Sequence, residues 1–144
     1  MHTTRLTLMC HARTVAQKLA RFPTNEPVEN IGPASDVLAA RFDASRRLTC
    51  APELRTRQTA AWLCADAHID QALRDCDWGQ WSGQAIKDLQ RSQTAALQAW
   101  LEDPDATPHG GESIAQVCER VSKWLVSLQT TPGHVVAVTH PFII

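Results

Sequence analysis

The chain has 144 residues, of which 44% are hydrophobic and 20% are charged, as is ordinary for one soluble globular domain with its own core. Its net charge of -1 argues against a general nucleic-acid binder and against electrostatic docking on anionic membranes. No apolar run approaches the roughly 20 residues that span a bilayer, and the N-terminus lacks the apolar region of a signal peptide, so we expect a cytoplasmic protein with no membrane or nucleic-acid partner.

The N-terminal half predicts two strands, each followed by a polar segment. Residues 5–10 (RLTLMC) are short and apolar, which indicates a buried strand. A long loop with about one helical turn follows, and residues 35–42 predict a helix. Residues 47–50 (RLTC) predict the second strand. Pro52 then favours a helix over residues 52–65, because proline suits the first turn of a helix.

The C-terminal half predicts two helices and a last strand. Residues 75–83 form a turn-rich loop, and residues 85–101 have the spacing of one helix. Ser113 is a candidate N-cap for the next helix. One face of that helix is expected to carry its apolar residues, which are Ile114, Val117, Cys118, Val121, Leu125 and Leu128. Residues 134–139 (HVVAVT) predict a strand buried on both faces.

The alternation of strands and helices predicts an α/β fold. We expect a three-layer sandwich, with a mostly parallel central sheet and helices on both faces, in a single domain over residues 1–144. Functional sites of such folds lie beyond the C-terminal ends of the strands. The three predicted strands lead to His11, to the segment containing Arg55 and to His140, so we expect these residues to meet.

The cysteines predict neither a disulfide framework nor a metal site. There are five, at positions 10, 50, 64, 76 and 118, and no two have the C-x-x-C spacing. We expect them to be reduced and to pack as small apolar residues. The sequence also has no phosphate-binding glycine loop, so no nucleotide cofactor is expected.

Five short motifs occur in a fixed order along the chain. They are CHART at 10–14, PELRTRQT at 52–59, LRDCDWGQWSG at 73–83, GGES at 110–113 and TH at 139–140. In this order they match R-H-G-x-T, P-x-x-R-x-x-x-T, L-R-E-x-D-x-G-x-W-x-G, G-G-E-S and a strand that ends in S/T-H. The chain therefore resembles the histidine phosphatase superfamily, which includes the phosphoglycerate mutases.

The resemblance implies roles for four residues. His11 would attack phosphorus and form a phosphohistidine, since neutral imidazole is abundant near pH 7. Arg55 would hold phosphoryl oxygens with its planar fork of donors, and His140 would hydrogen-bond the transferred group. Asp75 is the candidate general acid that protonates the leaving oxygen, and Asp77 is the alternative.

The chain also departs from the family pattern. Cys10 stands where the family has an arginine, which predicts weak activity, and Ala12 replaces a glycine. Asp75 occupies a position where glutamate is more common, and Pro141 one where glycine is frequent. The chain ends at Ile144, where the family usually continues into another helix, so we expect the domain to lack that helix.

Two further residues are candidate substrate contacts. Arg13 either swings inward to replace the arginine lost at Cys10 or faces solvent or substrate, and Thr14 offers a hydroxyl donor. With these residues, the sequence predicts a metal-independent and cofactor-independent phosphatase that acts on a small phosphorylated metabolite. The alternatives are a phosphoglycerate mutase-type phosphotransferase and a catalytically impaired relative that binds a phosphorylated ligand. No substrate or oligomeric state is predicted.

Overall fold

The computed structural model describes residues 3–29, 46–63, 66–130 and 132–144. Within them, four parallel strands form one sheet in the order β1-β4-β2-β3. The strands are β1 (Thr4–Cys10), β2 (Arg47–Cys50), β3 (His68–Ile69) and β4 (Gly133–Thr139). The three predicted strands are confirmed, whereas the two-residue β3 was not predicted. The helix predicted at 35–42 lies outside the described residues.

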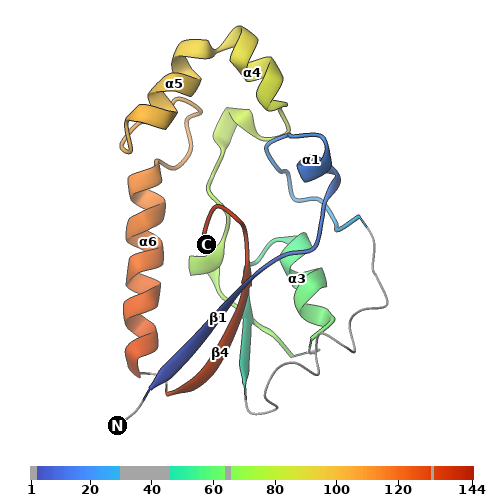
Figure 1. The fold of residues 1–144 in the computed structure, drawn as a ribbon, viewed down its shortest axis with the longest axis vertical. Helices are drawn as coiled ribbons and strands as arrows, with labels where there is room; N and C mark the ends of the chain where they lie inside the picture. Colours follow the sequence, from blue (N-terminus) through green and yellow to red (C-terminus); the bar gives the residue numbers. More distant parts are fainter. Residues whose placement is uncertain (1–2, 30–45, 64–65, 131) are drawn as a thin grey trace.

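The central strand β4 aligns the ends of its neighbours (Figure 1). Cys10 at the end of β1 pairs with Thr139, and Cys50 at the end of β2 pairs with Val138. The residues that follow these three strands therefore leave the sheet at the same edge. This arrangement confirms the predicted parallel sheet and the predicted meeting of the strand ends.

Five helices accompany the sheet in the described part of the chain. They are α1 (Val15–Lys18), α3 (Leu54–Ala61), α4 (Ile86–Ser92), α5 (Thr94–Glu102) and α6 (Ile114–Ser127). Three short 3-10 helices are η1 (Gln71–Leu73), η2 (Gly79–Trp81) and η3 (Leu128–Thr130). None of the helices formed by described residues has the length and apolarity that crossing a membrane requires.

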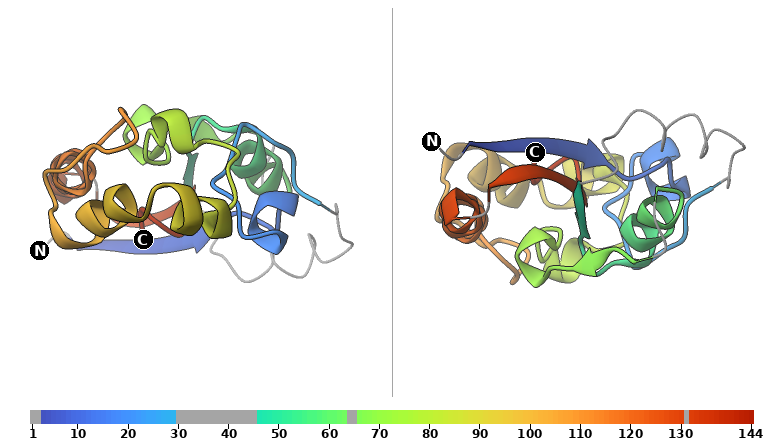
Figure 2. Two further views of the ribbon diagram at one scale, coloured as in Figure 1. Left: turned by 90° about the horizontal axis from the view of Figure 1, so that it is seen from above. Right: turned by 90° about the horizontal axis from the view of Figure 1, so that it is seen from below.

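The sheet lies between α3 on one face and α6 on the other (Figure 2). Val136 and Val138 of β4 pack in one cluster with Ala60 of α3. Ala137, which lies between those two valines, packs with Trp124 of α6. Since successive side chains of a strand point to opposite faces, β4 is buried on both. The expected three-layer sandwich is confirmed.

The helix predicted over residues 52–65 is shorter than expected. It begins at Leu54, and Glu53 before it has an extended backbone with φ −66° and ψ 156°. Pro52 therefore lies outside the helix, which ends at Ala61. Because the Glu53 side chain makes no capping hydrogen bond to α3, its carboxylate is available for contacts with other segments.

The prediction of one helix over residues 85–101 is wrong. Gln93, with φ −137° and ψ 47°, separates α4 from α5. Its amide oxygen accepts a hydrogen bond from Nε1–H of the buried Trp81 at 3.2 Å. An unbroken helix would hold Leu89 and Trp100 about 16 Å apart along its axis. The break instead allows both side chains to join one cluster.

The predicted apolar face of α6 is correct only in part. Ser113 caps the helix, as predicted, and Val117 is buried. Cys118 and Leu125, however, are exposed, and the other buried residue of α6 is Trp124. Trp124 lies seven residues after Val117 and so shares its face, whereas the two exposed residues are each rotated by about 100°.

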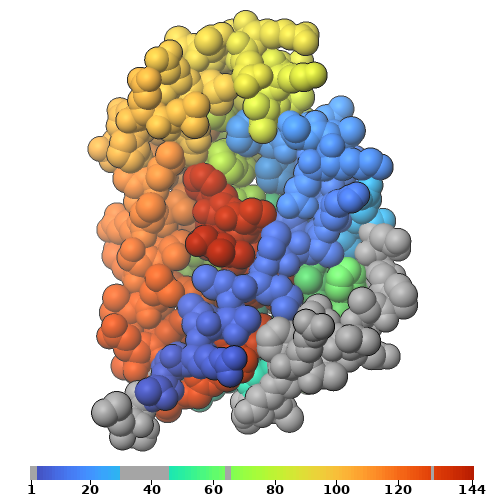
Figure 3. Space-filling model, in the orientation of Figure 1, coloured from blue at the N-terminus to red at the C-terminus, as the bar shows by residue number. Residues whose placement is uncertain are grey.

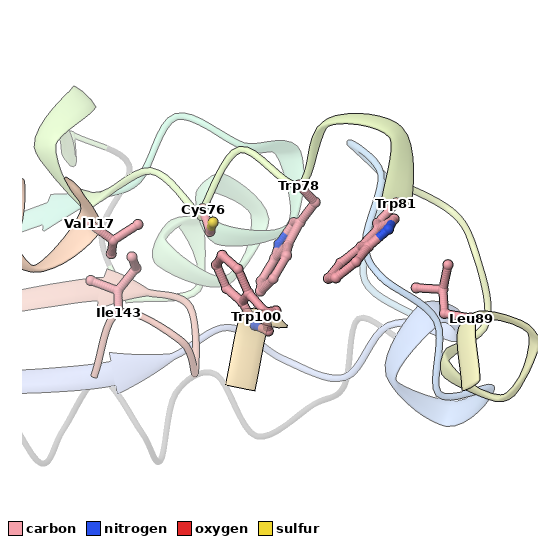
Figure 4. Packing of buried hydrophobic residues seen from close by; sticks show 7 residues of the cluster. All are labelled: Cys76, Trp78, Trp81, Leu89, Trp100, Val117 and Ile143. Atoms are coloured by element: carbon pink, nitrogen blue, oxygen red, sulfur yellow. The ribbon is translucent and has the colours of Figure 1, made fainter. Parts of the chain in front are cut away.

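An aromatic cluster joins α5 to two other segments of the chain. Figure 4 shows Trp78, Trp81 and Trp100 packed side by side. The ring of the fully buried His109 lies 4.8 Å from Trp100 and 5.0 Å from Trp81. Phe142, near the C-terminus, lies 5.0 Å from Trp78. The cluster therefore binds α5, the loop at 75–83 and the C-terminal turn into one unit.

Two loops meet in this unit at a pair of glycines. A Cβ atom on Gly111 would lie 1.9 Å from the carbonyl oxygen of Asp77, and one on Gly79 would lie 2.1 Å from that of His109. Such distances are far below any van der Waals contact. The two loops therefore pack backbone against backbone, which explains why both matched motifs carry glycine here.

We predict that Gly111→Ala lowers the free energy of unfolding by about 3 kcal/mol, because the new methyl group has no space beside the Asp77 carbonyl. Gly110→Ala is the matched control. No atom lies within 4 Å of its added Cβ, so only its positive φ of 77° is penalised, by about 1 kcal/mol. Urea denaturation measures both values, and equal losses would contradict the close approach of the loops.

Candidate active site

The predicted site residues lie at the edge of the sheet where the strands end. His11 follows β1, Arg55 lies in the first turn of α3 after β2, and His140 follows β4. Asp75 comes from the loop after η1 and contacts both Arg55 and His140. The structure thus brings these four residues together, and the roles expected for them stay predictions.

His11 presents one ring nitrogen to the site. Its Nδ1 lies 2.7 Å from the carbonyl oxygen of Ala12, and because a carbonyl only accepts, Nδ1 carries the proton. Nε2 then has a lone pair and makes no hydrogen bond to a described residue. Burial lowers the pKa of His11, and the charges of Arg55 and His140 add to this effect. The ring is therefore a neutral imidazole near pH 7.

Arg55 is the buried cation of the site, with 2% of its surface exposed. Its Nη1 donates to the carbonyl oxygen of Thr24 at 3.0 Å, and its Nη2 donates to Oδ2 of Asp75 at 2.8 Å. The Nε–H is buried and has no partner among the described residues. Nε is therefore the one guanidinium nitrogen that makes no hydrogen bond to a described residue.

Thr59, the threonine of the second motif, links Arg55 to the loop that carries His11. Its hydroxyl donates to the Arg55 carbonyl oxygen at 2.8 Å and accepts from the Ala12 amide at 2.9 Å. The side chain is buried, so both bonds are shielded from water. This explains structurally why a hydroxyl is found one helical turn after the arginine.

Arg120 of α6 holds the loop that carries Asp75 through hydrogen bonds to the loop backbone. The Nη1 atom of Arg120 donates to the carbonyl oxygens of Ala72 and Arg74 at 2.9 and 2.8 Å. Oδ1 of Asp75 accepts the amide N–H of Cys76 at 2.8 Å, which leaves Oδ2 directed at Arg55. Arg120 was not identified from the sequence, because nothing in its helical spacing distinguishes it from a surface arginine.

Asp77, the alternative acid, has a different environment. Its Oδ1 accepts the backbone N–H of Gly79 at 3.0 Å, which closes the turn before η2. Its own amide donates to Oε1 of Glu112 at 3.0 Å. The side chain is thus engaged in the turn, and no ion pair joins it to Arg55 or His140, both of which the structure describes.

His140 is fully buried and lies against His11, with ring centroids 5.3 Å apart. Its Nε2 lies 2.6 Å from Oε2 of Glu53, and its Nδ1 lies 3.7 Å from Oδ2 of Asp75. The second distance is too long for a hydrogen bond. His140 is therefore held through Nε2 alone.

Glu53 is the site residue that the sequence analysis missed. It stands at an unspecified position of the P-x-x-R motif and was assigned to the first turn of a helix. Burial alone would raise its pKa, but the hydrogen bond and charge of His140, the Asp75 amide and Arg55 together lower the pKa of Glu53 below its ordinary value. An acidic residue three positions after the end of a strand and two positions before Arg55 was the available signal.

The remaining predicted residues lie at the margin. Cys10 is exposed, and burial of part of its side chain raises the pKa of the thiol, which stays neutral. Arg13 is paired with Glu29 at 3.3 Å, with 66% of its side chain exposed, so it has not swung inward to replace the missing arginine. Thr14 is buried and caps α1 by accepting the Gln17 amide.

Two of the hollows at the site adjoin each other. The smaller, of about 150 Å³, is lined by His11, Thr14 and Phe142, and the larger, of about 390 Å³, is lined by Glu53. Both are lined by Pro23, Arg55, Asp75 and Trp78. Figure 3 shows the segments that border the smaller hollow, with the C-terminal residues in red beside the segment around α1 in blue.

Comparison with known sequences connects this site to a family. Residues 6–144 match the family model of the histidine phosphatase superfamily (branch 1). A bifunctional protein of Mycobacterium tuberculosis is 29% identical over 131 residues, with 83% of this chain and 36% of that protein covered. A glucosyl-3-phosphoglycerate phosphatase of Mycolicibacterium vanbaalenii is 28% identical over 129 residues, with 83% of this chain and 57% of that protein covered. The chain thus spans about a third to somewhat over half of these relatives.

Solved structures show the same fold. A mycobacterial glucosyl-3-phosphoglycerate phosphatase in complex with vanadate superposes with a TM-score of 0.82 at 24% identity, covering 98% of this chain and 78% of that one. The α-ribazole phosphatase of Shigella flexneri superposes with a TM-score of 0.77 at 23% identity, covering 94% and 73%. At such identities the likeness establishes the fold alone.

Proposed function

Because the chain belongs to the histidine phosphatase superfamily, we propose that it is a metal-independent phosphatase that hydrolyses a small phosphate monoester through a phosphohistidine at His11. The observation that carries the proposal is the fixed tautomer of His11. Its Nδ1–H is bound to the Ala12 carbonyl oxygen, so the lone pair is on Nε2, beside Arg55 and His140.

In the first step, Nε2 of His11 attacks phosphorus and a P–N bond forms, while the bond from phosphorus to the ester oxygen breaks. Asp75 gives its proton to the leaving oxygen as the general acid. The assignment of Asp75 rests on its contacts with Arg55 and His140, whereas Asp77 closes a turn.

In the second step, water attacks the phosphohistidine. Asp75, now a carboxylate, accepts a proton from that water, the P–N bond breaks, and the electron pair returns to Nε2 of His11. Inorganic phosphate then leaves. In this scheme Arg55 supplies the positive charge that stabilises the transferring group, His140 hydrogen-bonds that group, and no metal or cofactor takes part.

Two buried polar atoms support phosphate binding at this place. Nε of Arg55 and Nδ1 of His140 are each buried and have no hydrogen-bond partner among the described residues. Buried polar atoms in proteins are nearly always hydrogen-bonded. Oxygen atoms of a phosphoryl group between the two side chains would satisfy both.

The names of the relatives suggest where a substrate screen should begin. Two proteins similar to this chain are named glucosyl-3-phosphoglycerate phosphatase and α-ribazole phosphatase. Both names describe phosphate monoesters of small metabolites. We propose a substrate of the same chemical class. Glucosyl-3-phosphoglycerate and the phosphate ester of α-ribazole are the first compounds to test.

One observation favours a second function, the binding of a phosphorylated ligand without turnover. The charge of Arg55 is compensated by Asp75, His140 is bound to Glu53, and Cys10 adds no charge. The attraction for a phosphate dianion is therefore weaker than a site with two free arginines would offer. Measured turnover distinguishes the two functions.

The proposed function predicts that His11→Ala abolishes the hydrolysis of an aryl phosphate, because the variant lacks the Nε2 lone pair that attacks phosphorus. Phosphate release is the measurement, and EDTA should leave it unchanged. His68→Ala, at an exposed position on β3, is the control and should keep full activity. Activity that survives in His11→Ala, or that EDTA removes, refutes the mechanism.

The pH dependence follows from the lowered pKa of His11. Only the neutral imidazole attacks phosphorus, so kcat/KM rises as the pH rises through that pKa. Since burial lowers the pKa below its ordinary value of 6.5, the midpoint of the acid limb should lie below pH 6.5. NMR titration of the His11 ring checks the same value without substrate ionisation. A midpoint above 6.5 by both methods would contradict the burial argument.

Because Cys10 stands where the family has an arginine, we predict that phosphate binding is weak and that an arginine at this position strengthens it. Cys10→Arg should tighten vanadate binding about tenfold to a hundredfold, which corresponds to about 1.5–3 kcal/mol for a charge-assisted hydrogen bond. Arg13 should not interfere, because it is held outside by Glu29. The double variant Cys10→Arg with Arg13→Ala is the control and should behave like the single one. No gain in either variant would show that the pocket no longer accepts an arginine there.

A further inference from the structure

The buried contact between Glu53 and His140 has no role in the scheme above. Nε2 of His140 lies 2.6 Å from Oε2 of Glu53, with 1% and 17% of the two side chains exposed. Oε1 of Glu53 also accepts the backbone N–H of Asp75 at 3.2 Å. The carboxylate therefore holds the His140 ring in one orientation and ties it to the loop of the proposed acid.

This orientation decides which nitrogen faces the phosphoryl site. With Nε2 bound to Glu53, Nδ1 is the atom left without a hydrogen bond to a described residue. A neutral ring that donates from Nε2 has a lone pair on Nδ1, which repels a phosphoryl oxygen. Only the imidazolium carries a proton on both nitrogens and donates from Nδ1.

We propose that Glu53 is a positioning residue that holds His140 through Nε2 as an imidazolium, so that Nδ1–H donates to the phosphoryl group. The inference rests on the proposed phosphatase function and deepens it. It gives the site a second positive charge, in place of the one that Cys10 does not supply.

The charged and titratable groups that face His140 come from three segments. They are Glu53 and Arg55 at the start of α3, Asp75 after η1, and His11 after β1. Arg55 and Asp75 compensate each other at 2.8 Å, and His11 is neutral. The charge of Glu53 therefore dominates at Nε2. The lowered pKa of Glu53 is consistent with a carboxylate there at neutral pH.

The test removes this charge and keeps the size of the side chain. Glu53→Gln should weaken vanadate binding about tenfold at pH 7, because the neutral amide removes the negative charge that favours the imidazolium. Vanadate binding should also be lost at a lower pH than in the unaltered protein. The matched control is Glu119→Gln, an exposed glutamate paired with Lys123 at 3.1 Å, which should change neither value.

Turnover of two substrates separates positioning from proton donation. If Glu53 acts through His140, kcat/KM of Glu53→Gln falls about tenfold for both 4-nitrophenyl phosphate and an alkyl phosphate. A loss confined to the alkyl phosphate, whose leaving oxygen needs a proton, would make Glu53 the general acid and overturn the proposal. Unchanged vanadate affinity with an unchanged pH profile would overturn it as well.

A measurement on the unaltered protein covers the case in which the variant does not fold. In ¹⁵N spectra at pH 7 with vanadate bound, both ring nitrogens of His140 should be protonated, and an unprotonated Nδ1 overturns the proposal. The two proposals also fail separately. If His11→Ala kept its activity, the phosphatase mechanism would fall, whereas protonation of both His140 nitrogens beside bound vanadate would still support the role of Glu53.

Discussion

The parallel pairing of β4 with β1 and β2 is the constraint on which the candidate site depends. Because the three strands run in the same direction and end in register, His11 and His140 leave the sheet as neighbours. The end of β4 also fixes the loop of the proposed acid, since the buried Thr139 hydroxyl donates to the Leu73 carbonyl oxygen at 2.7 Å. A one-residue slip of β4 would turn Thr139 to the other face and separate Asp75 from both histidines.

The charge of Arg55 is already paired with Asp75, so a bound phosphoryl group would compete with this carboxylate. Arg55 and Asp75 form a buried ion pair, so a phosphoryl group that takes over the Nη2 hydrogen bond of Arg55 would displace the carboxylate. Displacement removes the attraction between Arg55 and Asp75, and it frees the carboxyl group of Asp75 beside the phosphoryl group. In the proposed mechanism, this exchange would couple the binding of the phosphoryl group to the release of Asp75 from Arg55.

The sequence predicted the framework of the site because the framework depends on local patterns. Short apolar runs located the three strands, and the residues after them supplied His11, Arg55 and His140. Glu53 was missed because its importance comes from a contact with His140, 87 residues away, which no local pattern records. The break at Gln93 was missed for a related reason, since the Gln93 side chain accepts a hydrogen bond from the indole of Trp81, which no local pattern records.

The position of Trp78 has a spectroscopic consequence. Its indole lines both hollows of the site and lies 5.6 Å from Trp100, while most of its surface is shielded from solvent. Indole emission responds to changes in nearby charge and hydration. An oxyanion that enters either hollow changes both within contact distance of this ring, so the intrinsic fluorescence of the protein reports occupancy of the site without any attached label.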